Sequence, residues 1–207
     1  NLMADREMEI KFHLQNKGLL EEKLGALGGK VRHPRVNEWN LRFDTPEKLI
    51  SARGQALRLR KDERVRLTFK GTPDQLGEIT DRVELEVEVS DFSTTRRILE
   101  ARGYRVMVIY EKFRTTWEYR GAEIVVDELP MGDFCEIEAE SEELIRDIAG
   151  DLKLNWGQRI NTSYLGIFDQ LKSALNLEEI NLTFEDMQGM HISSSDLAIV
   201  HIYPGDE

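Results

Sequence analysis

The sequence lacks the features that mark secreted and membrane-spanning proteins. Its 207 residues include one cysteine, Cys135, which excludes an internal disulfide bond and a cysteine-based zinc site. The longest apolar runs, such as Val106–Tyr110, are far too short to span a bilayer, and Asn1–Arg6 has no apolar signal core. We therefore expect a cytoplasmic protein without a membrane partner.

A net positive charge is also missing. The chain has 28 Lys and Arg against 39 Asp and Glu, a formal net charge of -11, and its pI is about 5.0. Binding to nucleic acids or to anionic membranes needs a basic surface, so neither is expected as a partner. Net charge does not report distribution, so a local basic pocket stays compatible with this composition. A homodimer is compatible too, although no residue demonstrates one.

What the sequence does contain is alternation of apolar and polar residues with a period of two. Such alternation predicts β-strands, here at Glu7–Leu14, Glu38–Phe43, Ala56–Arg60, Val65–Lys70, Asp81–Val89, Tyr104–Tyr119, Ala122–Glu128 and Asp133–Glu140. Helical spacing occurs at Leu19–Leu27, Phe92–Ala101, Glu142–Leu152 and Tyr164–Leu175. Many strands joined by short turns indicate an α+β fold with a mainly antiparallel sheet, and eight strands can close into a barrel.

The length suits one domain, or one domain with an appendage. The strand-rich pattern and its helices occupy residues 1–175, which we predict to be the main domain. Residues 176–207 differ because they are polar with scattered apolar positions, and they include one more strand-like stretch at Leu197–Tyr203. We interpret this segment as an appendage of unknown role.

Like-charged side chains recur on single strand faces. For any one strand, the ordinary interpretation is a solvated face of an antiparallel sheet. Across the set, however, these positions are almost wholly ionised, and the charges sort by sign within strands. The basic sets are Arg58 with Arg60, Arg66 with Lys70, and Lys112 with Arg114; the acidic sets are Glu7 with Glu9, Glu84 with Glu86, and Glu136 with Glu138.

Two ligand chemistries would offset the repulsion within these sets. Carboxylate clusters suit hard cations such as Mg²⁺ or Mn²⁺. Clusters of Arg and Lys suit phosphate. A metal-bound polyphosphate requires both kinds of cluster in one site. If the charged faces converge, they line the inside of the barrel, and the apolar faces pack outward against the helices.

Several short motifs follow one another along the chain. The first is an E-x-E-x-K triplet at Glu7–Lys11. The others are Phe43–Pro46 (FDTP), Ala56–Arg60 (ALRxR), Leu67–Gly71 (LTxKG), Arg82–Glu86 (R-x-E-x-E), Lys112–Arg114 (K-x-R), Asp127 with Gly132–Glu138, and Ser163-Tyr164. In this order they resemble the CYTH superfamily of triphosphate tunnel metalloenzymes, which includes class IV adenylyl cyclase-like and thiamine triphosphatase-like proteins. The resemblance runs from about Glu7 to Leu171 and covers most of the chain.

The resemblance implies an eight-stranded tunnel that uses Mg²⁺ or Mn²⁺ to cleave or cyclise a triphosphate-bearing small molecule. Glu7, Glu9 and Lys11 are then the expected catalytic residues. The expected phosphate-binding residues are Lys11, Arg58, Arg60, Arg66, Lys70, Lys112 and Arg114. The expected metal ligands are Glu7, Glu9, Glu84, Glu86, Asp127, Glu136 and Glu138.

Four further residues have less specific interpretations. Arg82 pairs with a neighbouring glutamate or joins the site, and His13 is better explained as a solvated rim residue than as a catalyst. Cys135 alternates opposite to Glu136, so packing is its expected role. Arg159 lies near the last predicted helix, and the sequence is equally compatible with a contact to substrate and with a position on the surface.

Three functions fit these observations. The first is a metal-dependent phosphohydrolase acting on inorganic triphosphate, thiamine triphosphate or a nucleoside triphosphate. The second is a class IV adenylyl cyclase, in which the ribose 3′-hydroxyl of ATP replaces water as the nucleophile. The third is a non-catalytic polyphosphate-binding or nucleotide-binding module, which the many carboxylates disfavour. No motif separates the first two, and analogy with the breadth of the family slightly favours hydrolysis.

Overall fold

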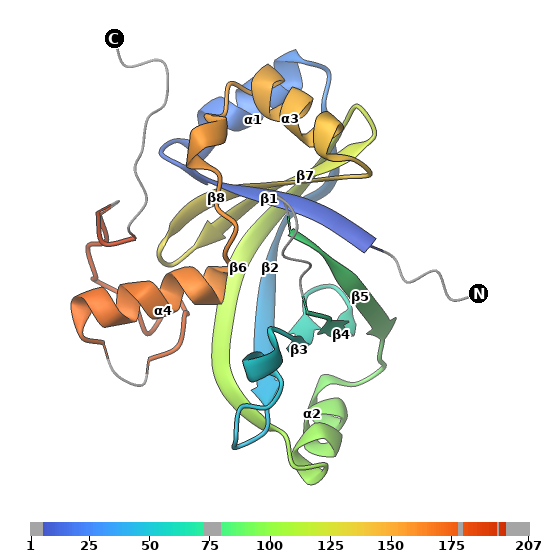
Figure 1. The fold of residues 1–207 in the computed structure, drawn as a ribbon, viewed down its shortest axis with the longest axis vertical. Coiled ribbons are helices and arrows are strands. Elements are labelled where there is room, and N and C mark those ends of the chain that lie inside the picture. Colours follow the sequence, from blue (N-terminus) through green and yellow to red (C-terminus); the bar gives the residue numbers. More distant parts are fainter. Residues whose placement is uncertain (1–5, 73–79, 178–179, 194, 198–207) are drawn as a thin grey trace.

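The computed structural model describes residues 6–72, 80–177, 180–193 and 195–197, without the side chains at positions 6, 7, 80 and 81. Within this part the strands are β1 (Arg6–Leu14), β2 (Lys30–Asp44), β3 (Ala56–Lys61), β4 (Val65–Lys70), β5 (Thr80–Glu88), β6 (Arg105–Tyr119), β7 (Ala122–Leu129) and β8 (Gly132–Ala139). Every strand pairing is antiparallel, and the strands close into a barrel in the order β1-β5-β4-β3-β2-β6-β7-β8 (Figure 1). The predicted eight-stranded antiparallel barrel is confirmed.

The four predicted helices are present, each within two residues of its expected ends. They are α1 (Lys17–Ala26), α2 (Phe92–Ala101), α3 (Glu142–Asp151) and α4 (Tyr164–Leu175), with short 3₁₀ turns η1 (Ser51–Arg53) and η2 (Trp156–Gln158). Each α-helix begins after a residue whose side-chain oxygen accepts a backbone N–H of the first turn: Asn16, Asp91, Ser141 and Ser163. No helix in the described ranges combines the length and the apolar character needed to cross a bilayer.

Strand β2 is longer than the sequence pattern predicts. The expected strand covers Glu38–Phe43, whereas β2 begins at Lys30. Its first half is exposed and polar, and it contains Pro34, which cannot donate a ladder hydrogen bond. The register against β6 shifts twice in this half, once between Val31 and His33 and once across Pro34, between His33 and Val36. These irregularities accommodate Pro34, so the strand continues through a residue that usually ends one.

The apolar core lies outside the barrel, where the helices cover it. Ile10 on β1 and Ile137 on β8 pack in one cluster with Leu20 of α1 and Ile145 of α3, and all four are at most 1% exposed. These two helices lie together at one end of the molecule in Figure 1, and α2 lies at the other. Burial of each such side chain contributes about 1.5–3 kcal/mol. The expectation that apolar faces point outward is therefore confirmed, and the interior is left to polar side chains.

The described part of the appendage completes one edge of β6. Strand β7 pairs with β6 only from Phe113 onward, which leaves the preceding residues of β6 without that neighbour. Leu182 fills the gap: its N–H donates to Ile109 O at 3.0 Å, and its O accepts from Glu111 N–H at 3.0 Å. It also forms a parallel bridge with Tyr110. The segment thus extends the barrel wall. Of the strand expected at Leu197–Tyr203, only Leu197 lies within the described residues. The domain division at residue 175 stays a prediction.

Candidate functional site

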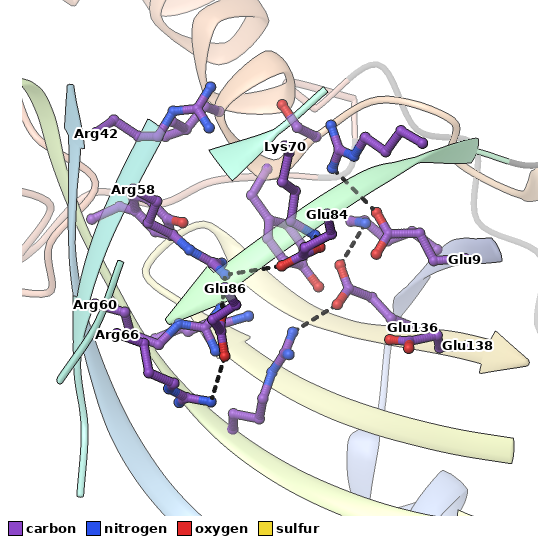
Figure 2. A pocket seen from close by; sticks show the side chains of 18 of the residues that line it. Glu9, Arg42, Arg58, Arg60, Arg66, Lys70, Glu84, Glu86, Glu136 and Glu138 are labelled. Carbon is purple, nitrogen blue, oxygen red and sulfur yellow. Dashed lines mark hydrogen bonds and ion pairs between the residues drawn. The ribbon is translucent and has the colours of Figure 1, made fainter. Parts of the chain in front are cut away.

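The polar strand faces surround a cavity of about 360 Å³ inside the barrel (Figure 2). Of its nineteen lining residues, all but Tyr110, Ser163, Tyr164 and Leu165 are charged, with nine basic and six acidic side chains. A chain with a net charge of -11 therefore concentrates positive charge in its interior. The alternating charged faces converge, as the chemical argument from the sequence requires.

Most of the predicted site residues line this cavity. They are Glu9, Lys11, Arg58, Arg60, Arg66, Lys70, Glu84, Glu86, Lys112, Arg114, Glu136 and Glu138. Asp127 is not among the lining residues because it is fully buried in the wall. The backbone of Glu7 pairs with Arg82 of β5, but the side chain of Glu7 lies outside the described residues. The individual roles assigned to these residues stay predictions.

Asp127 on β7 organises one group of cations. Its carboxylate accepts hydrogen bonds from Lys112 Nζ at 2.8 Å, from Arg114 Nε at 2.7 Å and from the Tyr164 hydroxyl at 2.8 Å. The residue is 0% exposed. A buried charge of this kind must be paired and hydrogen-bonded. We therefore interpret Asp127 as a counter-ion that holds Lys112 and Arg114, and its predicted role as a metal ligand gains no support from this arrangement.

Glu136 on β8 forms a second buried centre. One carboxylate oxygen lies 2.6 Å from Lys11 Nζ, and the other lies 2.6 Å from Arg114 Nη2. Burial alone would raise the pKa of Glu136, but Lys11 and Arg114 outweigh burial and hold that pKa well below its usual value. Burial likewise opposes the charge of Lys11, yet Glu136 and Glu9 raise the pKa of Lys11. Both partners are therefore ionised at neutral pH.

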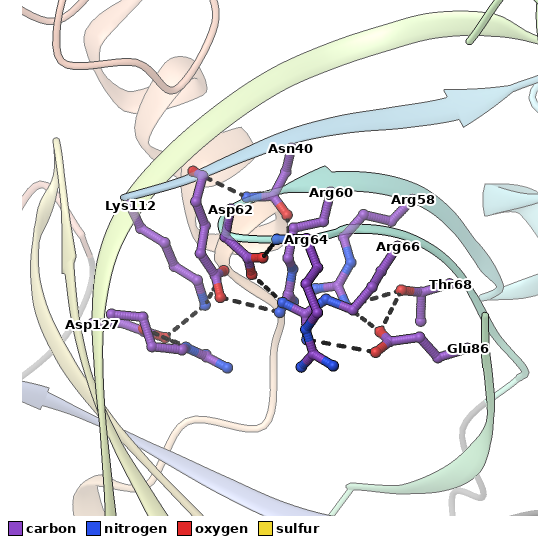
Figure 3. A network of polar contacts seen from close by, with 12 residues as sticks. Asn40, Arg58, Arg60, Asp62, Arg64, Arg66, Thr68, Glu86, Lys112 and Asp127 are labelled. Atoms are coloured by element: carbon purple, nitrogen blue, oxygen red, sulfur yellow. Dashed lines mark hydrogen bonds and ion pairs between the residues drawn. The ribbon is translucent and has the colours of Figure 1, made fainter. Parts of the chain in front are cut away.

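A third centre was not identified from the sequence, and it involves Glu38 on β2. Glu38 is 2% exposed and lies 3.1 Å from Arg60 Nη1 and 3.6 Å from Lys112 Nζ. Asn40 Oδ1 accepts from Arg60 Nε at 3.3 Å, and Figure 3 shows these two side chains side by side. Burial would raise the pKa of Glu38, but Lys112 and Arg60 lower it far below the usual value. Glu38 and Asn40 thus fix the direction in which Arg60 points.

The acidic residues of β5 face the basic residues of β3 and β4. Glu86 accepts from Thr68 Oγ1 at 2.8 Å, and Glu84 forms an ion pair with Lys70. Arg58 Nη2 lies 3.8 Å from a carboxylate oxygen of each glutamate. In this structure Glu84 and Glu86 compensate the charge of these cations, so their predicted role in metal binding stays a prediction.

The carboxylates best placed for a metal ion are Glu9 and Glu138. They are direct partners across the β1–β8 pairing, and Glu123 of β7 is the partner of Glu138 on the next strand. Within the described ranges no three acidic, histidine or cysteine side chains form a ready-made metal cage. Mg²⁺ usually takes one or two carboxylates and completes its shell with waters and substrate phosphates. The Glu9–Glu138 pair fits that pattern.

Tyr164, the first residue of helix α4, also lines the cavity, and no strand pattern could place it there. The Tyr164 ring lies 4.6 Å from Lys11 Nζ and 5.2 Å from Lys112 Nζ, so it stacks against two predicted phosphate ligands. The strand periodicity also predicts two other lining residues that the sequence analysis did not name. Arg42 lies four residues after Glu38 on β2, and Tyr110 lies two residues before Lys112 on β6, so each shares the interior face with that residue.

The four residues with less specific interpretations are now placed. Arg82 lines the cavity and its Nη2 lies 3.7 Å from Glu9, so it both joins the site and pairs with a glutamate. His13 packs edge-on against Phe134 with ring centroids 4.9 Å apart. Cys135 is fully buried in the outer core, and burial raises the pKa of its thiol. Arg159 donates to Trp156 O at 3.0 Å and is not a lining residue.

Comparison with known proteins gives relatives of the same architecture. Adenylate cyclase CyaB of Aeromonas hydrophila is 28% identical over 188 residues, which cover 84% of this chain and 94% of that protein. A solved structure from Vibrio parahaemolyticus, provisionally assigned as an adenylate cyclase, has a TM-score of 0.70 at 21% identity and covers 81% of this chain and 99% of its own. HpAC1 from Hippeastrum, described as revealing a dominant triphosphatase activity, has a TM-score of 0.58 at 18% identity and covers 79% and 95%.

The family comparison agrees with the geometry of the barrel. The family model of the CYTH domain matches residues 5–152, which is more than half of the chain and includes all eight strands. The chain therefore belongs to the CYTH family.

Proposed function

We propose that the protein is a phosphohydrolase that uses Mg²⁺ or Mn²⁺ to cleave a triphosphate bound inside the barrel. The observation that carries this proposal is the composition of the cavity wall, where nine cations and six carboxylates surround about 360 Å³. A triphosphate with its metal ion has the same combination of strong negative charge and bound cation. An uncharged metabolite would require neither this many cations nor this many carboxylates in its binding site.

The basic residues would bind the phosphate oxygens. Arg58 and Arg60 offer planar guanidinium groups for bidentate hydrogen bonds, whereas Lys11 and Lys112 act as point charges. Glu38 and Asp127 hold Arg60 and Lys112 in place before a ligand arrives. Such preorganisation lowers the cost of ordering side chains when the substrate binds.

The proposed reaction is hydrolysis of a phosphoanhydride bond. The oxygen of a water molecule bonds to the terminal phosphorus, the bridging P–O bond breaks, and orthophosphate leaves together with the shortened phosphate and one proton. Glu9 and Glu138 would hold the metal ion, which supplies charge neutralisation and lowers the pKa of bound water. Lys11, whose partner Glu136 keeps it protonated, would stabilise the negative charge that develops on the phosphate oxygens.

A second candidate function is adenylyl cyclisation. It is favoured by the relative from Aeromonas hydrophila, which is named an adenylate cyclase and is covered over 94% of its length. Against it, only Tyr110, Tyr164 and Leu165 among the lining residues offer an apolar surface to a purine. The dominant triphosphatase activity described for HpAC1 supports the view that this barrel also serves hydrolysis.

A product assay decides between the two. Purified protein is given inorganic triphosphate, thiamine triphosphate or ATP in separate reactions with Mg²⁺ or Mn²⁺. Release of orthophosphate supports the proposal and identifies the substrate, whereas cyclic AMP with diphosphate from ATP would establish the cyclase. Tight triphosphate binding without either product would indicate the non-catalytic module.

Two variants test the metal site. Glu9→Gln and Glu138→Gln keep the shape of the side chain and remove its charge, so each should abolish metal-dependent turnover while the barrel stays folded. Glu142→Gln is a matched control because Glu142 is 44% exposed and pairs with Arg146 on the helix surface, away from the cavity. Full activity in either tunnel variant would refute the assignment of that carboxylate.

A further inference from the structure

One wall of the cavity carries an arginine, Arg42, that no carboxylate pairs with among the described residues. Arg42 on β2 stands directly opposite Arg58 on β3, and both side chains line the cavity. Like charges in directly opposite positions of a sheet repel each other. Among the described residues Arg42 has no ion-pair partner, and Arg58 Nε makes no hydrogen bond. Burial and the charges of Arg58 and Arg82 lower the pKa of Arg42.

Tyr110 lies among these cations. It is 7% exposed, and its position on β6 is paired with Asn40 of β2. Burial alone would raise the pKa of Tyr110, but Arg58, Arg60 and further basic residues outweigh burial and lower it. A phenol hydroxyl in such surroundings can donate a hydrogen bond to an anion. The bridge from Leu182 holds the backbone of Tyr110 at this point.

The strand order places this wall across the tunnel from Glu9 on β1 and Glu138 on β8. In the closed barrel, β2 is four strands away from β1 in either direction, and β3 is four strands away from β8. Figure 2 shows the same separation, with Arg42 and Arg58 on one side and Glu9 and Glu138 on the other. An extended anion can therefore be held at both walls at once.

We propose that Arg42 and Tyr110, together with Arg58, form a further phosphate subsite for the phosphate group farthest from Glu9 and Glu138. This inference rests on the proposed function and adds a preference for a longer polyphosphate. A triphosphate contacts both walls at once, whereas a diphosphate contacts only one of them. The subsite acts without a metal ion, because every group in it is a hydrogen-bond donor.

Metal-free binding of inorganic triphosphate tests the subsite. Titration calorimetry in the presence of a chelator compares the wild type with Arg42→Gln and Tyr110→Phe. Loss of a charge-assisted hydrogen bond should weaken triphosphate binding about 10- to 100-fold for Arg42→Gln, and loss of a neutral one about 3- to 10-fold for Tyr110→Phe. Binding of diphosphate should weaken less than about threefold in both variants, on the same arithmetic.

Two matched controls carry the same substitutions outside the cavity. Arg35→Gln removes an arginine that is 49% exposed and pairs with Glu128, and Tyr119→Phe removes a hydroxyl that donates to Asp151. Both should bind triphosphate as the wild type does. The urea midpoint of Arg42→Gln should equal or exceed that of the wild type, because the variant relieves the repulsion with Arg58.

The outcomes separate this inference from the proposed function. If Arg42→Gln binds triphosphate within about twofold of the wild type, or loses affinity for triphosphate and diphosphate equally, the subsite is wrong even in an active hydrolase. If the wild type binds triphosphate but releases no phosphate with Mg²⁺ or Mn²⁺, the proposed function fails. The affinities of Arg42→Gln for triphosphate and diphosphate then still show whether the subsite exists. A wild type that does not bind triphosphate refutes both.

Discussion

Replacement of Asp127 by Asn tests whether the tunnel cations are held by buried counter-ions. The Asp127 carboxylate is 0% exposed and accepts from Lys112, Arg114 and Tyr164 at 2.7–2.8 Å. Asparagine has nearly the same shape but no charge, and half of its amide is a donor. Two buried cations would then face a neutral group with one acceptor.

The expected cost follows from this burial. Removal of one partner from a buried ion pair destabilises a protein by about 3–5 kcal/mol, because the remaining charge stays buried without compensation. For a domain of this size, each kcal/mol lowers the melting temperature by about 2–4 °C. We therefore expect the melting temperature of Asp127→Asn to fall by about 6–20 °C.

Urea unfolding followed by circular dichroism measures the effect. Glu142→Gln is the control, since its exposed pair with Arg146 should contribute about 0–1 kcal/mol. Inorganic triphosphate at 100 times its dissociation constant stabilises a binding protein by about 2.7 kcal/mol. It should recover part of the loss in Asp127→Asn, because phosphate oxygens can replace the lost acceptor. A free energy of unfolding within about 1 kcal/mol of the wild type would refute the counter-ion role.

Three further predictions follow from the same geometry. The folded-state pKa of Glu136 is depressed. The ionised Glu136 therefore stabilises the folded protein fully above its unfolded pKa of about 4.3, and this contribution is lost as pH falls toward the folded pKa. Glu136→Gln should flatten the decline in urea-unfolding free energy between pH 5 and 3. Chelation of divalent metal should abolish phosphate release while the metal-free melting curve keeps one cooperative transition. Leu182→Ala, at a fully buried position, should destabilise by about 2–5 kcal/mol in urea unfolding and raise the KM for triphosphate through Tyr110.

The sequence by itself determined the elements of this protein and the kind of chemistry in its interior. Alternation is a local property, because successive side chains of a strand point to opposite faces. It therefore revealed eight strands and showed that Lys112 and Arg114, or Glu136 and Glu138, share a face. It failed in the first half of β2, where an exposed polar stretch and Pro34 conceal a strand.

The tertiary structure alone decided which faces meet. Strand β1 pairs with β5 and β8, which are remote in sequence, and no local pattern encodes a pairing between distant strands. That closure places Glu38 beside Arg60 and sets Arg42 across the tunnel from Glu9. Tyr164, which belongs to the Ser163-Tyr164 motif, reaches the site from the first turn of α4, and only long-range packing places its ring beside Lys11 and Lys112. Local periodicity assigns each side chain to a face, whereas barrel closure determines which of those faces share a cavity.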